Sequence, residues 1–190
     1  DMLQSGPAAA VMGATEVGDV LVDDDVITLD MGGTSTDVSL ITDGTAEISA
    51  EREVAELPVG VSSVDIENVG AGGGSLGWTD EGGMLKVGPR SAGARPGPAC
   101  YGRGGTDPAL TDALVRLGWI RPETFLGGRM PLDADAADRA LATLAETRDS
   151  TVDDTAQAMV DIAVADLNRC VRLVSVQRGY NPKQYAIYAF

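Results

Sequence analysis

Residues 26–49 read VITLDMGGTSTDVSLITDGTAEIS, and this stretch decides the fold. An apolar run ends in Asp30, a glycine-rich turn follows, and an alternating run begins at residue 36. The pair Asp43-Gly44 signals a second tight turn, after which the alternation resumes. The pattern predicts strands over residues 26–30, 36–42 and 45–51, joined as an antiparallel trio.

The first of these turns has the composition of a phosphate-binding loop. Its two glycines let the backbone approach a phosphate closely and offer N–H donors, and the carboxylates that flank it suit Mg²⁺. An ordinary hairpin, in which the same carboxylates bond backbone amides, is the alternative. On the phosphate interpretation the candidate catalytic residue is Asp30, the metal ligands are Asp30 and Asp37, and the nucleotide-binding residues are Gly32, Gly33, Thr34, Ser35, Thr36 and Asp37.

Two other nucleotide-binding signatures fail. Neither Lys86 nor Lys183 has the neighbours of a Walker loop. Residues 72–77, GGGSLG, match the dinucleotide pattern GxGxxG, but no helical pattern follows them.

The composition excludes several functions. The chain has 29 acidic and 14 basic residues and a net charge of −15, so we exclude nucleic-acid binding. It has no histidine, which removes Ser-His-Asp and Cys-His catalysis, and we expect Cys100 to pack rather than react. The two cysteines, Cys100 and Cys170, are too few for a four-cysteine metal site, and both thiols are expected to be reduced. The acidity indicates either adaptation to a salt-rich cytoplasm or the bias of an acidic fragment.

The remaining chain is read from its local signals. No apolar run is long enough to span a membrane and the N-terminus has no signal-like stretch, so we expect a cytoplasmic protein. The Gly/Pro tract over 69–106 is interpreted as packed turns around a hairpin of 75–79 with 84–87. Helices are predicted over 5–17, 111–117, 133–147 and 152–176, and a final strand over 185–190. The expected parts are the phosphate hairpin (26–51), an inserted Gly/Pro-rich lobe (60–130), and helices with a final strand (133–190).

Five segments in their order carry a family resemblance: SGPAAAVMGA, LDMGGTSTDVSLI, VGAGGGSL, GPRSAGARPGPACYGRGGTDPALTDALVRLG and QRGYNPKQYAIYAF. They resemble the hydantoinase A/5-oxoprolinase (N-methylhydantoinase) family, which also includes a subunit of acetone carboxylase. The resemblance implies an α/β fold: a ribonuclease-H-like half of an actin/sugar-kinase/Hsp70-type ATPase. In such a half, antiparallel hairpin strands and one parallel strand form the sheet, and the Gly-rich lobe is an insertion. The chain is expected to be an internal piece of a longer protein. This piece alone is not expected to hydrolyse ATP.

The function implied by this resemblance is an ATP-dependent cyclic amidohydrolase. It would use ATP and Mg²⁺ to phosphorylate the carbonyl of a hydantoin or 5-oxoproline ring, which water then opens. The alternatives are the ATP-using subunit of a ketone carboxylase and a nucleotide switch of actin/Hsp70 type. Partners would be a small cyclic amide, the rest of the polypeptide and a second subunit of hydantoinase B type, with no nucleic acid and no membrane. Candidate substrate-facing residues are Arg90, Ser91, Arg95 and Tyr101, unless the arginines only tie Gly-rich turns to the acidic surface.

Overall fold

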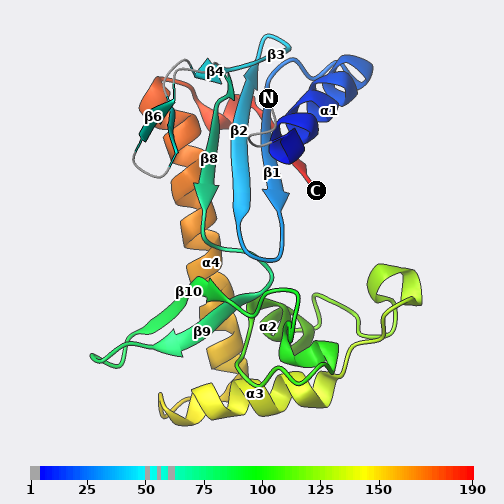
Figure 1. Cartoon of the computed structure of the whole chain (residues 1–190), viewed down its shortest axis with the longest axis vertical. Coiled ribbons are helices and arrows are strands. Elements are labelled where there is room, and N and C mark those ends of the chain that lie inside the picture. The colour runs from blue at the N-terminus through cyan, green and yellow to red at the C-terminus, as the bar shows by residue number, and fades with distance from the viewer. Residues whose placement is uncertain (1–4, 50–51, 55–56, 60–62) are drawn as a thin grey trace. The chain divides into compact units, whose positions relative to one another are not determined.

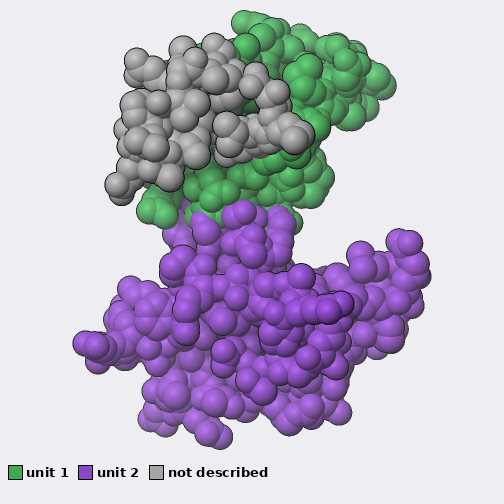
Figure 2. Space-filling view, viewed as in Figure 1, with its two compact units in different colours: residues 1–31, 36–69, 168–190 green, residues 32–35, 70–167 purple. Residues whose placement is uncertain are grey.

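The computed structural model describes residues 5–49, 52–54, 57–59 and 63–190, which form two compact units (Figure 2). The first unit comprises Asp1–Met31, Thr36–Val69 and Asn168–Phe190. The second comprises Gly32–Ser35 and Gly70–Leu167. The turn that decides the fold therefore packs with the Gly-rich tract, whereas its flanking strands belong to the first unit.

A mixed sheet forms the centre of the first unit (Figure 1). Strand β1 (Val26–Met31) pairs antiparallel with β2 (Thr36–Thr42) and parallel with β11 (Ala186–Ala189), so the predicted hairpin and the predicted parallel strand are both confirmed. Helix α1 (Ser5–Leu21) is four residues longer than expected and packs on the sheet. The core beneath it consists of Val11, Ala14, Val26, Ile41 and Ile66.

The third strand of the expected trio was wrong over most of its length. Of the predicted segment 45–51, β3 (Thr45–Ala46) is the described strand that pairs with β2. The next strand, β4 (Ile48–Ser49), pairs instead with β7 (Ser63–Val64). Residues 50–51 lie outside the described part of the chain. The rest of the β2 edge is taken by β8 (Ile66–Val69), a strand that the sequence did not predict. The edge can be paired only once, and at residues 36–39 of β2 it is β8 that pairs, which brings the buried side chains of Ile66 and Val69 to the sheet. Separately, β5 (Arg52–Val54) pairs antiparallel with β6 (Leu57–Val59).

Glu47 has a different role, because it binds an arginine near the end of the chain. The Arg178 guanidinium donates to the Glu47 carboxylate at 2.8 Å, also binds Asp65, and lies 3.5 Å from Glu67. Arg178 ends η3 (Val176–Arg178), a 3-10 turn that follows the last long helix, and η4 (Pro182–Gln184) leads on to β11. The three carboxylates thereby fix the C-terminal segment of the first unit to the β3–β8 side of its sheet.

The second unit contains a hairpin, two helices and a third helix as far as Leu167 (Figure 1). Strands β9 (Ser75–Thr79) and β10 (Leu85–Ser91) confirm the predicted hairpin, and the Asp80 carboxylate closes its turn by accepting from the amides of Gly82 and Met84. The helices α2 (Leu110–Arg116), α3 (Ala134–Glu146) and α4 (Val152–Val174) match the prediction within two residues at each end. Short 3-10 turns lie at η1 (Ala99–Tyr101) and η2 (Phe125–Gly128).

Helix packing and ion pairs hold this unit together. Arg116 on α2 binds Asp138 on α3 at 2.9 Å and Asp153 on α4 at 2.7 Å. Asp133 caps α3 by accepting from the Ala136 amide at 2.9 Å. Nine buried residues form the main core: Val87, Leu110, Ala113, Leu141, Leu144, Ala156, Met159, Val160 and Ala163. Because β10 and all three helices contribute to this core, the Gly/Pro tract belongs to a folded unit, as expected.

Candidate functional site

The β1–β2 hairpin presents two carboxylates at its end. Asp30 and Asp37 face each other in the strand register, and both side chains are half-buried. One oxygen of Asp37 accepts a hydrogen bond from the Asn68 side-chain amide on β8 at 2.7 Å. Across the described ranges no group of three or more His, Cys, Asp or Glu residues is arranged to hold a metal ion. Two carboxylates still suit Mg²⁺, which commonly takes one or two protein carboxylates together with water and phosphate oxygens.

In the turn between these strands, most backbone carbonyls accept hydrogen bonds while three of the four amides remain available. The Gly32 amide donates to the Ser35 carbonyl at 2.9 Å, which closes the turn. The carbonyls of Gly32 and Gly33 accept from the amides of Gly73 and Gly74 at 3.0 and 2.7 Å. In the described part of the chain the N–H groups of Gly33, Thr34 and Ser35 have no protein acceptor, and Gly33 and Thr34 are exposed. Successive free N–H groups of this kind form an anion-binding concavity.

Glycines behind the turn permit this arrangement. A Cβ on Gly72 would lie 2.8 Å from both the Gly32 carbonyl oxygen and the Ser35 nitrogen. A Cβ on Gly74 would lie 2.7 Å from the Gly33 carbonyl oxygen. Any side chain at either position would push the turn away, so residues 72–74 support the loop and do not form a separate dinucleotide site.

The four predicted substrate-facing residues divide into two pairs. Ser91 donates from its hydroxyl to the Gly33 carbonyl at 3.2 Å, and it lines one pocket together with Arg95. Arg90 is exposed and stacks over the Trp78 ring at 5.5 Å. Tyr101 is half-buried against Phe125, and burial raises the pKa of its hydroxyl. Neither Arg90 nor Tyr101 lines the pocket, so the structure brings together only Ser91 and Arg95.

Asp112 is a buried carboxylate that sequence reasoning missed. It accepts from the backbone amides of Ala99, Cys100 and Ala109 at 3.1, 2.7 and 2.8 Å. It stands at the third position of α2, and its bond to Ala109 is the reciprocal half of a capping box. An Asp in the first turn of a predicted helix was the available signal. Its neighbour Thr111 donates to the Gly73 carbonyl at 2.7 Å, so the start of α2 also holds the glycines behind the loop.

The two cysteines are free and buried. Burial, followed by the nearby Asp112 carboxylate, raises the pKa of the Cys100 thiol far above its usual range. A thiol that keeps its proton is a poor nucleophile, so the expectation that Cys100 packs is supported by its environment.

This fold is consistent with one half of an actin-like ATPase. The family described as Hydantoinase/oxoprolinase matches residues 1–190, and the chain belongs to that family. The chain is 40% identical over 186 residues to caprolactamase subunit alpha of Pseudomonas jessenii, and this alignment covers 97% of the chain and 27% of that protein. It is 35% identical over 204 residues to 5-oxoprolinase 1 of Arabidopsis thaliana, at 98% and 16% coverage.

A solved structure gives the same result for the fold. The nucleotide-free structure of acetone carboxylase, described in connection with ATP-dependent acetone carboxylation, superposes with a TM-score of 0.88 at 33% identity. The match covers 96% of the chain and 26% of that structure's chain. The chain thus spans between 16% and 27% of the length of these relatives. Among the described helices none has the length and apolarity needed to cross a membrane.

Proposed function

We propose that the protein containing this chain is an ATP-dependent hydrolase of cyclic amides and that residues 30–37 bind the phosphates of ATP. The observation that carries the proposal is the turn at 32–35: the amides of Gly33, Thr34 and Ser35 have no protein acceptor in the described part of the chain, while the carbonyls of Gly32 and Gly33 are occupied. In the reaction the amide oxygen attacks the γ-phosphorus and the bond to ADP breaks. One water then adds to the activated carbon and the C–N bond opens. A second water releases inorganic phosphate.

The residues of the turn have separate roles in this proposal. The N–H groups of Gly33, Thr34 and Ser35 bind phosphate oxygens, and the hydroxyls of Thr34 and Ser35 add further donors. The Gly32 amide is already bonded within the turn, so this glycine serves the close approach of the backbone. Thr36 is fully buried, and we leave its hydroxyl out of the binding set.

The carboxylates complete the proposed site. Asp30 and Asp37 would hold Mg²⁺, which neutralises the charge on phosphate oxygens when it is bound. Asn68 orients Asp37 through the hydrogen bond at 2.7 Å. Asp30 forms no such bond in the described part of the chain, and we assign it the larger share of the metal binding.

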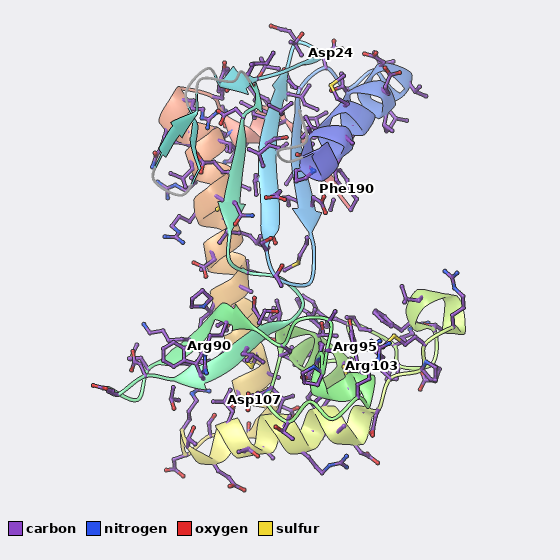
Figure 3. All side chains as sticks on the ribbon, viewed as in Figure 1. Asp24, Arg90, Arg95, Arg103, Asp107 and Phe190 are labelled. Atoms are coloured by element: carbon purple, nitrogen blue, oxygen red, sulfur yellow. The ribbon has the colours of Figure 1, made fainter. Side chains whose placement is uncertain are left out.

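The test is Asp30→Asn in the full-length protein. The substitution keeps the shape of the side chain and removes its charge, so ATP turnover should fall by about 10²-fold or more while the melting temperature is kept. Asp24→Asn is the matched control, because Asp24 is an exposed carboxylate before the start of β1 (Figure 3). Near-normal turnover in Asp30→Asn would mean that this carboxylate only caps the hairpin.

A ketone carboxylase subunit is the second candidate, favoured by the TM-score of 0.88 to acetone carboxylase. The two candidates differ in the compound that stimulates ATP turnover. Hydantoin, 5-oxoproline or caprolactam should stimulate it in an amidohydrolase, whereas acetone with bicarbonate should do so in a carboxylase.

The partners and the compartment follow from the same proposal. We infer a second subunit, because the caprolactamase relative is named as a subunit. We infer a cytoplasmic protein, because ATP-using chemistry with two free thiols suits a reducing compartment.

A further inference from the structure

A pocket of about 310 Å³ lies in the second unit, where the end of β10 meets two Gly-rich turns. Ligand pockets are roughly 300–1,000 Å³, so this one suits a small molecule. Its lining comes from Leu76, from residues 91–92 and 95–97, and from residues 104–107.

Close backbone packing gives this pocket a defined wall. A Cβ on Gly105 would lie 2.3 Å from the Gly97 carbonyl oxygen, so the two turns touch through their main chains. Gly97 has a φ of +82°, and its amide donates to the Ala92 carbonyl at 3.2 Å. The Ala92 amide in turn donates to Gly74 at 2.8 Å. The wall is therefore preformed by hydrogen-bonded main chain.

Two unpaired charges of opposite sign stand on this wall. Arg95 and Asp107 both line the pocket, and Figure 3 labels both side chains. Neither forms an ion pair or hydrogen bond with another residue in the described part of the chain. Both side chains are exposed, so a ligand in the pocket can reach them.

Ser91 connects the pocket to the candidate phosphate loop. It lines the pocket, and its hydroxyl donates to the Gly33 carbonyl at 3.2 Å while accepting from the Gly93 amide at 3.1 Å. A molecule in the pocket would therefore lie beside the turn proposed to bind the phosphates. That position suits the acceptor of a phosphoryl group.

We propose that the Arg95–Asp107 pocket binds the amide substrate and that this substrate is a small ring amide bearing a carboxylate. The Arg95 guanidinium would bind the carboxylate through its fork of donors, and Asp107 would accept the N–H of the ring. This assignment rests on the proposed function. It narrows the substrate class from cyclic amides in general to anionic ones.

The experiment compares two five-membered rings in the full-length protein, with its partner subunit present. 5-Oxoproline carries the carboxylate and 2-pyrrolidone lacks it, while both carry the ring N–H. Removing one charge-assisted hydrogen bond should raise KM by about 10- to 100-fold. Arg95→Gln should therefore raise KM for 5-oxoproline alone, and Asp107→Ala should raise it for both rings. In both variants KM for ATP should stay unchanged, and 5-oxoproline binding measured by calorimetry should weaken in parallel.

The controls are Arg121→Gln and Asp135→Asn, which replace exposed charges in the same unit away from the pocket. Equal effects of Arg95→Gln on both rings, or no effect on either, would overturn the pocket assignment and leave the proposed function standing. A wild-type preference for 2-pyrrolidone would overturn the substrate class. If no cyclic amide stimulates ATP turnover, the proposed function fails and the pocket assignment fails with it.

Discussion

Replacing Asp112 with asparagine should destabilise the second unit far more than any exposed Asp→Asn change. The carboxylate is fully buried and accepts three backbone amides, two on one oxygen and one on the other. An asparagine can present its oxygen to only one side, so its NH₂ group would face at least one of these donors. The substitution therefore leaves a buried N–H group without an acceptor and removes the charge from the bonds that remain.

The magnitude follows from these three bonds. One buried donor without a partner costs about 1–3 kcal/mol, and two bonds that lose their charge assistance weaken by about 1 kcal/mol each. We expect a loss of roughly 3–5 kcal/mol from a total stability of about 5–15 kcal/mol. For a chain of this size each kcal/mol lowers the melting temperature by about 2–4 °C, so the expected decrease is about 6–20 °C.

Tryptophan fluorescence is the assay, because Trp78 and Trp119, the two tryptophans of the chain, both lie in the second unit. Thermal and urea melts of wild type and Asp112→Asn are compared by this signal. Asp107→Asn is the matched control, since Asp107 is exposed and an exposed substitution should change stability by no more than about 0.5 kcal/mol. Equal midpoints for Asp112→Asn and wild type would refute the reasoning, because the three amides would then not depend on the carboxylate.

Three further outcomes are expected. Gly74→Ala should lower the free energy of unfolding by about 1–3 kcal/mol and weaken ATP binding by the full-length protein, because its Cβ would lie 2.7 Å from the Gly33 carbonyl oxygen. The control is Gly82→Ala, whose Cβ meets only a side-chain oxygen at 3.4 Å and which should change neither quantity. Equal behaviour of the two variants would count against the contact. Because burial raises the pKa of Cys100, the native thiol keeps its proton at a pH where the unfolded one loses it. Stability should therefore fall as pH rises above 9.0, less steeply in Cys100→Ala, and an unchanged slope would contradict this origin. The melting temperature should rise between 0.01 and 1 M NaCl, as the Debye length shortens from ~30 to ~3 Å around a net charge of −15; a flat profile would identify the acidity as a local bias.

Elements with strong local signals could be predicted from the sequence. The β1–β2 hairpin, the β9–β10 hairpin and the three helices of the second unit each show a clear period bounded by turn or capping residues. The strand after Asp43-Gly44 could not, because residues 47–51 and 66–69 compete for the same edge of β2. The segment 66–69 takes residues 36–39 of β2 and buries Ile66 and Val69 there, an outcome that depends on packing and not on a local signal.

The candidate site divides in the same way. The sequence Asp-Met-Gly-Gly-Thr at residues 30–34 indicated a phosphate loop, but a sequence alone cannot tell which amides are free. That depends on Gly73 and Gly74 occupying the loop's carbonyls from about forty residues further along the chain. The role of Asp112 was hidden for the same reason, since two of its three bonds reach back to Ala99 and Cys100.

Recognition through main-chain amides has a consequence for which amino-acid substitutions this protein tolerates. Every residue type except proline supplies an N–H, so many codon changes at Thr34 and Ser35 should preserve phosphate binding, with loss of only a hydroxyl. Gly72 and Gly74 cannot be replaced in this way, because any Cβ there would collide with the loop. The positions least able to vary should therefore stand behind the binding surface and would never touch the ligand. A survey of inherited or laboratory variants that counted only ligand-contacting residues would overlook the most sensitive part of the site.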